Sequence, residues 1–196
     1  MHRTIYLSRT FGGSLFAECR FILTFAFCMN DVIITSESYR SARQKGMDAV
    51  LELFVGAIND AIGSRLTAET MALINADQTT LLAYNILRDE VMDGGFVQLI
   101  HNGYGAFIFL NPFARAVRGW GLADLAALVN KGHKLYDAYH KEIEVECSDD
   151  EFMAMFERFE KFDDLDDSFI ENEEQWTAAV ARYIVDNVSR FAVIKE

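Results

Sequence analysis

The sequence is poor in residues that stiffen, cross-link or break a chain. It has a single proline and only three cysteines, Cys19, Cys28 and Cys147, in 196 residues. One proline excludes a collagen-like or proline-rich chain. An odd number of cysteines without a Cys-x-x-Cys pair supports neither a disulfide framework nor a cysteine-rich zinc site. No apolar run approaches the roughly 18 to 20 residues that a membrane-spanning helix needs. These absences favour a soluble protein in a reducing cytoplasm.

Positive charge is also scarce. Lys and Arg number 18 against 30 Asp and Glu, a formal net charge of -12. The electrostatic field of the protein therefore opposes attraction to phosphate backbones, and we expect no direct nucleic-acid binding and no membrane association. Apolar residues make up 51% and aromatic residues 13% of the chain, which is enough to bury a core and excludes an intrinsically disordered chain.

Residues 1–28 differ in composition from the rest. They hold three arginines against one glutamate, and a short apolar run over residues 21–28 ends just before Met29. A signal peptide is one interpretation, but the run is at the short limit for one, and its only small-x-small pattern lies inside it. We expect residues 1–28 to be an extension outside the fold, with Met29 as the start of the functional chain. Residues 29–196 are then predicted to form a single all-helical acidic domain.

Most of the chain after Ser36 repeats its apolar residues with a helical period. Apolar side chains recur three and four positions apart, the pattern of helices with one buried face. The segments with this pattern span residues 50–62, 77–91, 122–144, 152–162 and 176–188. The only strand-like segment, residues 32–35, is too short and isolated to build a sheet. The sequence predicts an all-α fold, a single compact array of about seven to eight amphipathic helices.

Polar residues indicate where several of these helices begin. Asp77 is placed to cap one helix. Asn111 followed by Pro112 is typical of an N-cap and a first helical residue. Ser148 and Glu151 form a capping-box pattern ahead of the next apolar segment.

The most unusual local sequence lies around paired glycines. Two helix-ending glycine signals stand nine residues apart, and the short helical piece between them should deliver Phe96 to the interior. Its polar side chains are expected to bond turn carbonyls. A glycine-rich anion loop is disfavoured, because the spacing of known phosphate loops is missing and Asp93 repels phosphate. The structural motif comprises Gly94, Gly95, Phe96, Gln98, Asn102 and Gly103.

Residues that carry catalytic or metal chemistry do not gather into a recognisable site. One predicted helix face places His133, Asp137, His140 and Glu144 at metal-ligand spacing. Ligands from a single helix rarely surround a metal, and no second cluster completes the shell. No nucleophile motif stands out, and His101 is expected at a turn or the surface. We predict no metal, no cofactor and no enzyme activity.

Acidic residues are concentrated in one window. Between Glu142 and Glu174, 33 residues in all, fifteen acids face only Arg158 and Lys161, a local charge of -13. Interleaved phenylalanines indicate a folded helical surface in place of a disordered acidic tail. One interpretation is a solvated face that keeps the protein soluble. The other is a surface whose carboxylates stand in for the phosphates of duplex DNA and compete for a basic groove.

Two short motifs resemble one known family. Residues 90–98, followed by residues 102–105, resemble the E-x-x-N-G-G-F-x-Q…N…G signature of the bacterial DNA-mimic protein family, with Asp93 where Asn is common. Residues 162–169 are similar to the acidic F-D-x-L-D-x-x-F segment of that family. The resemblance covers about residues 47–188. It implies an all-helical domain and, for part of the family, an acidic surface that occupies the DNA site of a DNA-binding protein.

The acid window and the resemblance together give a functional hypothesis. We predict a DNA mimic that sequesters a basic DNA-binding protein such as a transcription regulator. An acidic interaction domain without mimicry is the alternative, and an enzyme of unrecognised class is the third. Helical carboxylates three or four residues apart are about 5 to 6 Å apart at Cβ, close to the roughly 6 to 7 Å between phosphates of one strand, and a homodimer would lengthen the face. The predicted contact residues are Asp163, Asp164, Asp166, Asp167, Glu171 and Glu173.

Overall fold

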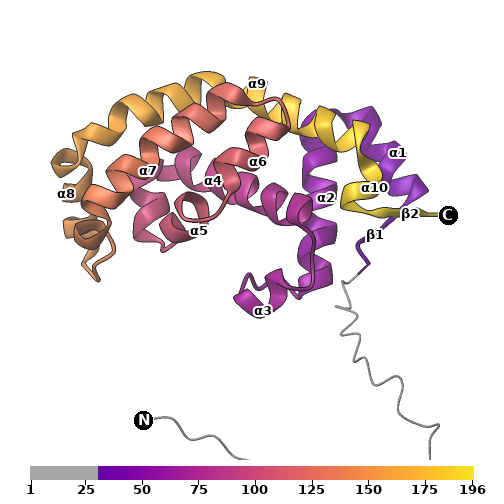
Figure 1. Cartoon of the computed structure of the whole chain (residues 1–196), viewed down its shortest axis with the longest axis horizontal. Coiled ribbons are helices and arrows are strands. Elements are labelled where there is room, and N and C mark those ends of the chain that lie inside the picture. The colour runs from indigo at the N-terminus through magenta and orange to yellow at the C-terminus, as the bar shows by residue number, and fades with distance from the viewer. Residues whose placement is uncertain (1–30) are drawn as a thin grey trace, which may run out of the picture.

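A computed structural model describes residues 31–196, so the predictions for residues 1–28 and for a start at Met29 lie outside the described residues. The helices are α1 (Ser36–Lys45), α2 (Met47–Ile62), α3 (Ala68–Met71), α4 (Ala76–His101), α5 (Gly105–Phe109), α6 (Phe113–Gly119), α7 (Ala123–Ile143), α8 (Asp149–Arg158), the 3-10 turn η1 (Glu160–Phe162), α9 (Asp163–Asp186) and α10 (Val188–Phe191). The strands are β1 (Ile33–Thr35) and β2 (Val193–Lys195). Figure 1 shows them in chain order from indigo to yellow.

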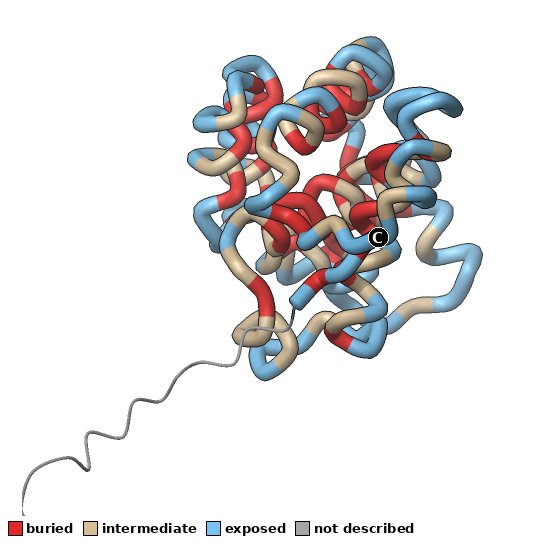
Figure 2. The backbone as a smooth tube through the Cα atoms, turned by 90° about the vertical axis from the view of Figure 1, so that its right-hand side faces the viewer, coloured by how far each residue is buried: buried red, intermediate tan, exposed pale blue. Residues whose placement is uncertain are grey.

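The prediction of an all-α fold is confirmed. Residues 31–196 form seven helices of at least seven residues, α4 among them, and three shorter ones. α4 is buried on more than one face, because its four successive residues 81–84 are all buried. A helix that is apolar on several sides needs cover on several sides, and α2, α7 and α9 pack against α4. Buried positions accordingly lie on the sides of the helices that face the interior, and exposed positions lie on the sides that face solvent (Figure 2). No helix in this range is both long enough and apolar enough to cross a membrane.

Side-chain caps begin four of the described helices, α1, α3, α4 and α8. Ser148 Oγ accepts a hydrogen bond from the Glu151 backbone, and Glu151 Oε2 accepts one from the Ser148 backbone, so the predicted capping box is confirmed. The prediction that Asp77 caps α4 is wrong. Asn75 is the cap, and its Oδ1 accepts from the Gln78 backbone at 2.9 Å. A capping box needs its partner three residues on, and Gln78 supplies that partner for Asn75.

The start of α6 differs from the prediction by one residue. Pro112, not Asn111, occupies the N-cap position. The Asn111 side chain instead donates to the carbonyl of Phe107, the fourth residue before it, at 3.1 Å. Asn111 therefore closes the end of α5 and does not open α6.

The prediction that residues 32–35 are too isolated to form a sheet is wrong. β1 pairs in parallel with β2, with Ile33 opposite Val193. The Val193 N–H also donates to the carbonyl of Val32 at 2.8 Å. Val32 and Ile34 are buried at 2% and 3% exposure, so this ribbon closes one end of the core with residues from both ends of the described chain.

Close packing of α5 on α7 brings an aromatic side chain to the middle of the molecule. α7 runs unbroken through Gly132, where an added Cβ would lie 2.9 Å from the ring of Phe109. The absent side chain lets Phe109 pass over α7. Its ring then stacks on Phe96 at a centroid distance of 6.2 Å, which connects α5 to the glycine motif.

Candidate partner-binding surface

α4 consists of two helical pieces joined at its paired glycines. Gly94 (φ -157°, ψ 27°) and Gly95 (φ 71°, ψ -174°) depart from helical geometry, and the helix resumes at Phe96. Gly103, with φ 82°, follows the second piece. The structure therefore has the predicted arrangement: the paired glycines end the first helical piece, and Gly103 follows the second. Gly95 lies in the left-handed region, where a side chain would be strained.

The polar side chains of the motif bond one another across this break. Gln98 Nε2 donates to Asp93 Oδ2 at 2.8 Å and to Glu90 Oε2 at 3.1 Å. Asn102 Nδ2 donates to the same Glu90 oxygen at 2.8 Å. The prediction that Gln98 or Asn102 bonds turn carbonyls is wrong, because ionised carboxylates are stronger acceptors than carbonyls. We name Glu90, Asp93, Gln98 and Asn102 the signature cluster; it fixes the angle between the two pieces of α4.

A contact from α9 holds the same break from the other side. Asp166 Oδ1 accepts a hydrogen bond from the Phe96 backbone N–H at 2.8 Å. A Cβ on Gly95 would lie 2.5 Å from Asp166 Oδ2, so glycine is required for this approach. Phe96 is fully buried, as predicted, and its ring meets Phe169 edge-on at 6.4 Å. The glycine motif and the acidic motif of α9 therefore form one structural unit.

Asp166 is therefore not the freely exposed acid that the charge pattern indicates. Its side chain is half-buried and its carboxylate is engaged by Phe96. Burial raises the pKa of Asp166 to about 6; the Phe96 N–H acts in the opposite direction, and the neighbouring Asp163 and Asp167 add to the rise. The carboxylate thus sits where its charge is disfavoured, held there by the need to satisfy a buried N–H.

We expect this raised pKa to make stability depend on pH. Between the ordinary value of 3.8 and about 6 the folded state keeps the Asp166 proton and the unfolded state loses it. The contribution of Asp166 to the free energy of unfolding should therefore fall as the pH rises from about 4 to 7, by an amount on the order of 2 kcal/mol. Asp166→Asn keeps an acceptor for the Phe96 N–H and should flatten this dependence in urea unfolding at several pH values. Glu171→Gln, an exposed control on the same helix, should keep the pH dependence of the wild type. The prediction would be contradicted if the free energy of unfolding of Asp166→Asn changed with pH as steeply as that of the wild type.

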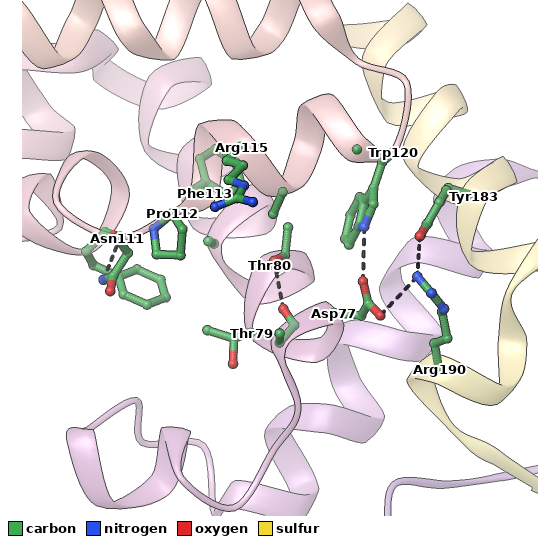
Figure 3. Close-up of a pocket in the computed structure, with 15 residues that line it drawn as sticks. Asp77, Thr79, Thr80, Asn111, Pro112, Phe113, Arg115, Trp120, Tyr183 and Arg190 are labelled. Carbon is green, nitrogen blue, oxygen red and sulfur yellow. Dashed lines mark hydrogen bonds and ion pairs between the residues drawn. The ribbon is translucent and has the colours of Figure 1, made fainter.

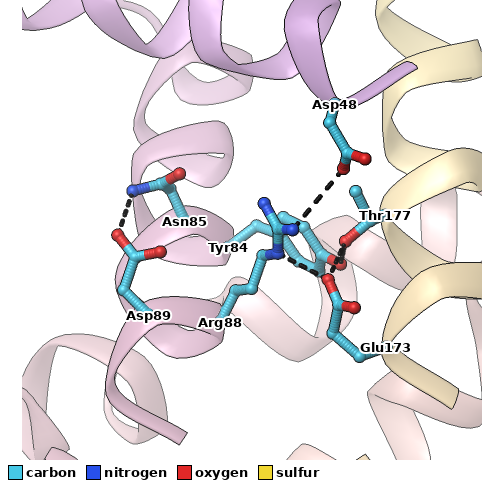
Figure 4. Close-up of polar contacts among 7 residues, drawn as sticks. All are labelled: Asp48, Tyr84, Asn85, Arg88, Asp89, Glu173 and Thr177. Carbon is cyan, nitrogen blue, oxygen red and sulfur yellow. Dashed lines mark hydrogen bonds and ion pairs between the residues drawn. The ribbon is translucent and has the colours of Figure 1, made fainter. Parts of the chain in front are cut away.

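Glu173 is not an exposed acid either, because only 7% of it is exposed. Its Oε1 accepts from Arg88 Nε at 2.5 Å and from Thr177 Oγ1 at 2.7 Å (Figure 4). The Tyr84 hydroxyl bonds Thr177 Oγ1 at 2.7 Å, and burial raises the pKa of Tyr84 above its ordinary value. Arg88 also pairs with Asp48 of α2 at 3.5 Å. Through Arg88, Glu173 thus connects α9 to α4 and α2. Removing its partners would leave a buried charge unpaired and would lower the stability of the fold.

The other four predicted acids lie exposed along α9. Glu174, which was not among the predicted contacts, is exposed on the same helix. Most of these positions follow one another at spacings of three or four residues, the spacing of neighbours on one helix face. We name this set the α9 acid stripe; it comprises Asp163, Asp164, Asp167, Glu171 and Glu174.

Little positive charge offsets these carboxylates. The two cations of the acidic window are engaged elsewhere: Arg158 pairs with Glu142, and the Lys161 ammonium donates to the Tyr139 hydroxyl and lies 5.0 Å from its ring centroid. Among residues 31–196, no ion pair includes a residue of the α9 acid stripe. The stripe therefore presents uncompensated negative charge to solvent.

Comparison with known proteins bears directly on this arrangement. The family model described as DMP19-like protein matches residues 72–187, a range that includes the signature cluster and the α9 acid stripe. The chain is also 32% identical over 153 residues to the DNA mimic protein DMP19 of Neisseria meningitidis serogroup B, strain ATCC BAA-335 / MC58. That alignment covers 78% of this chain and 92% of the relative. The chain belongs to the DMP19-like family. The resemblance to the DNA-mimic proteins, based on two short motifs, is thereby confirmed.

The three histidines within the described residues make local contacts. His133 Nε2 lies 3.5 Å from Asp137 Oδ1, and His140 Nδ1 bonds the Tyr136 carbonyl at 2.8 Å. His101 ends α4, half-buried, where Nδ1 bonds the carbonyl of Ile143 at 2.9 Å. Within the described residues, no group of three or more His, Cys, Asp or Glu side chains is arranged to hold a metal ion.

Proposed function

We propose that this DMP19-like protein is a DNA mimic that binds a basic DNA-binding protein, such as a transcription regulator, and keeps it from DNA. The α9 acid stripe carries the proposal. Its exposed carboxylates follow one helix and have no ion-pair partner among residues 31–196. A basic groove that fits the phosphates of DNA offers the complementary charge. The name of the Neisseria relative supports the same function.

The rigidity of α9 supports mimicry over simple solubility. Asp166 ties the first turns of α9 to α4, and Glu173 ties its middle to Arg88. Phe169 and Trp176 anchor the inner face in the core. Carboxylates on a helix fixed in this way are pre-positioned, so a partner loses less conformational entropy on binding them.

Charge repulsion along the α9 acid stripe supports a partner of opposite charge. Like charges three or four residues apart on a helix destabilise it by roughly 0.2 to 0.5 kcal/mol per pair. Asp163, Asp167 and Glu171 form such a series, and no cation within residues 31–196 relieves it through an ion pair. A basic groove would relieve that repulsion on binding.

We infer a binding function and no catalytic one. Within the described residues, the polar groups of Tyr84, Arg88 and Glu173 hold α4 to α9 (Figure 4). An acidic interaction domain without mimicry differs from a DNA mimic in one measurable way: its partner has no reason to prefer DNA as a competitor.

Capture from a lysate of the source cells separates these functions. Immobilised full-length chain should retain a basic protein that, purified by itself, binds duplex DNA. Added duplex should release that protein, and raising the salt concentration from about 50 to 300 mM should weaken capture steeply. A partner that does not bind DNA, or capture indifferent to duplex and to salt, would overturn the proposal. An equal concentration of a neutral polymer serves as the control for non-specific release.

A further inference from the structure

A cavity separate from the α9 acid stripe lies between the start of α4, α6 and the end of the chain. Its volume is about 560 Å³, within the roughly 300 to 1,000 Å³ of small-molecule sites. Ala83, Phe107, Phe113 and Trp120 contribute an apolar lining. Figure 3 shows Phe113 and Arg115 on the α6 side, and Trp120 near Asp77, Tyr183 and Arg190. None of the residues that line this cavity belongs to the α9 acid stripe.

One wall of the cavity is an aromatic panel held by hydrogen bonds. The Trp120 ring stacks on Tyr183 with centroids 4.8 Å apart. Trp120 Nε1 donates to Asp77 Oδ1 at 3.1 Å. Asp77 Oδ2 lies 3.4 Å from Arg190, which in turn donates to the Tyr183 hydroxyl at 2.7 Å. These contacts within the protein fix the panel, as in pre-formed binding sites.

The charge of the lining is opposite to that of the protein. Asp77 and Arg190 compensate each other across their ion pair. Arg115, the remaining charged residue of the lining, is exposed and forms no hydrogen bond or ion pair that the described residues supply. The cavity therefore carries one uncompensated positive charge in a chain whose net charge is -12. A guanidinium beside an apolar surface suits an organic oxyanion with an apolar body.

We infer that this cavity binds a small amphipathic organic anion, with its apolar body against Trp120 and Phe113 and its acidic group paired with Arg115. Stacking on the indole ring favours an aromatic or other flat body. The Arg115 fork favours a carboxylate or sulfonate over a neutral polar group.

Two matched probes test the inference. 1-Anilinonaphthalene-8-sulfonate is an aromatic anion, and N-phenyl-1-naphthylamine is its uncharged counterpart. Fluorescence titration of the full chain should show one site for the anion and weaker binding of the neutral probe. Arg115→Gln should weaken binding of the anion about tenfold, the effect of losing a charge-assisted hydrogen bond, and should change binding of the neutral probe less than about twofold.

Arg118→Gln is the matched control, because Arg118 is also exposed on α6 but does not line the cavity. This variant should bind both probes like the wild type. Near-ultraviolet circular dichroism of each variant checks that the fold is intact. Equal affinity for the two probes, or equal losses in the two variants, would overturn the inference. Either failure would leave the proposed DNA mimicry intact, since that depends on the α9 acid stripe.

Discussion

Phe96→Ala should lower the free energy of unfolding by about 3 to 5 kcal/mol, the cost of truncating a buried phenylalanine. Phe96 is fully buried between the rings of Phe109 and Phe169. Truncation leaves a cavity where α4, α5 and α9 meet. Other contacts fix the positions of these three helices, so they cannot all move inward to fill it. Because whole domains are stable by only about 5 to 15 kcal/mol, the variant should be close to unfolding at 37 °C.

Urea unfolding followed by far-ultraviolet circular dichroism gives the measurement. Leu110→Ala is the control, because Leu110 is 62% exposed and its truncation opens no interior space. That control should stay within about 0.5 kcal/mol of the wild type. A loss below about 1 kcal/mol in Phe96→Ala would contradict the structural role of the glycine motif, which is to place this ring in the core.

Neutralising the α9 acid stripe should abolish binding to the DNA-binding partner while the domain stays folded. The variant carries Asp163→Asn, Asp164→Asn, Asp167→Asn, Glu171→Gln and Glu174→Gln. All five side chains are exposed, so their amides leave no buried group unsatisfied. Loss of helix-dipole stabilisation in the first turn and relief of repulsion along the stripe oppose each other, and stability should change by less than about 1 kcal/mol.

The matched control carries the same change in net charge on other surfaces. It combines Asp31→Asn, Glu37→Gln, Glu52→Gln, Asp60→Asn and Asp124→Asn, all at exposed positions outside the acidic window. Both variants have a formal net charge of -7 in place of -12. If position matters and total charge does not, the control should bind like the wild type. Equal losses in the two variants would point to a general field effect and would contradict a defined stripe.

The amino-acid pattern of α9 distinguishes inward from outward acids more finely than charge density does. The inner face of the helix is marked by buried Phe162 just before its first turn and by buried Phe169, Trp176 and Val180 within it. Asp166 and Glu173 lie three or four residues from these positions, so the helical period alone places both carboxylates inward. Selecting acids by charge density missed this distinction.

Local patterns predicted the glycine break and the burial of Phe96, because both are decided by residues that are close in sequence. Contacts across the chain were not predictable from such patterns. β1 pairs with β2, which lies about 160 residues later in the sequence. The acceptor for the Phe96 N–H came from Asp166, 70 residues away. The cavity beside Trp120 likewise needs α4, α6 and α10 together.

Displacement of DNA from the captured partner tests DNA mimicry most directly. A fluorescently labelled duplex is bound to the purified partner, and its anisotropy is followed as the full-length chain is added. DNA mimicry predicts a fall to the value of the free duplex with the wild-type chain and with the charge-matched control, and no fall with the neutralised stripe. An anisotropy that stays high or rises with the wild-type chain, because duplex, partner and chain form one ternary complex, would contradict it.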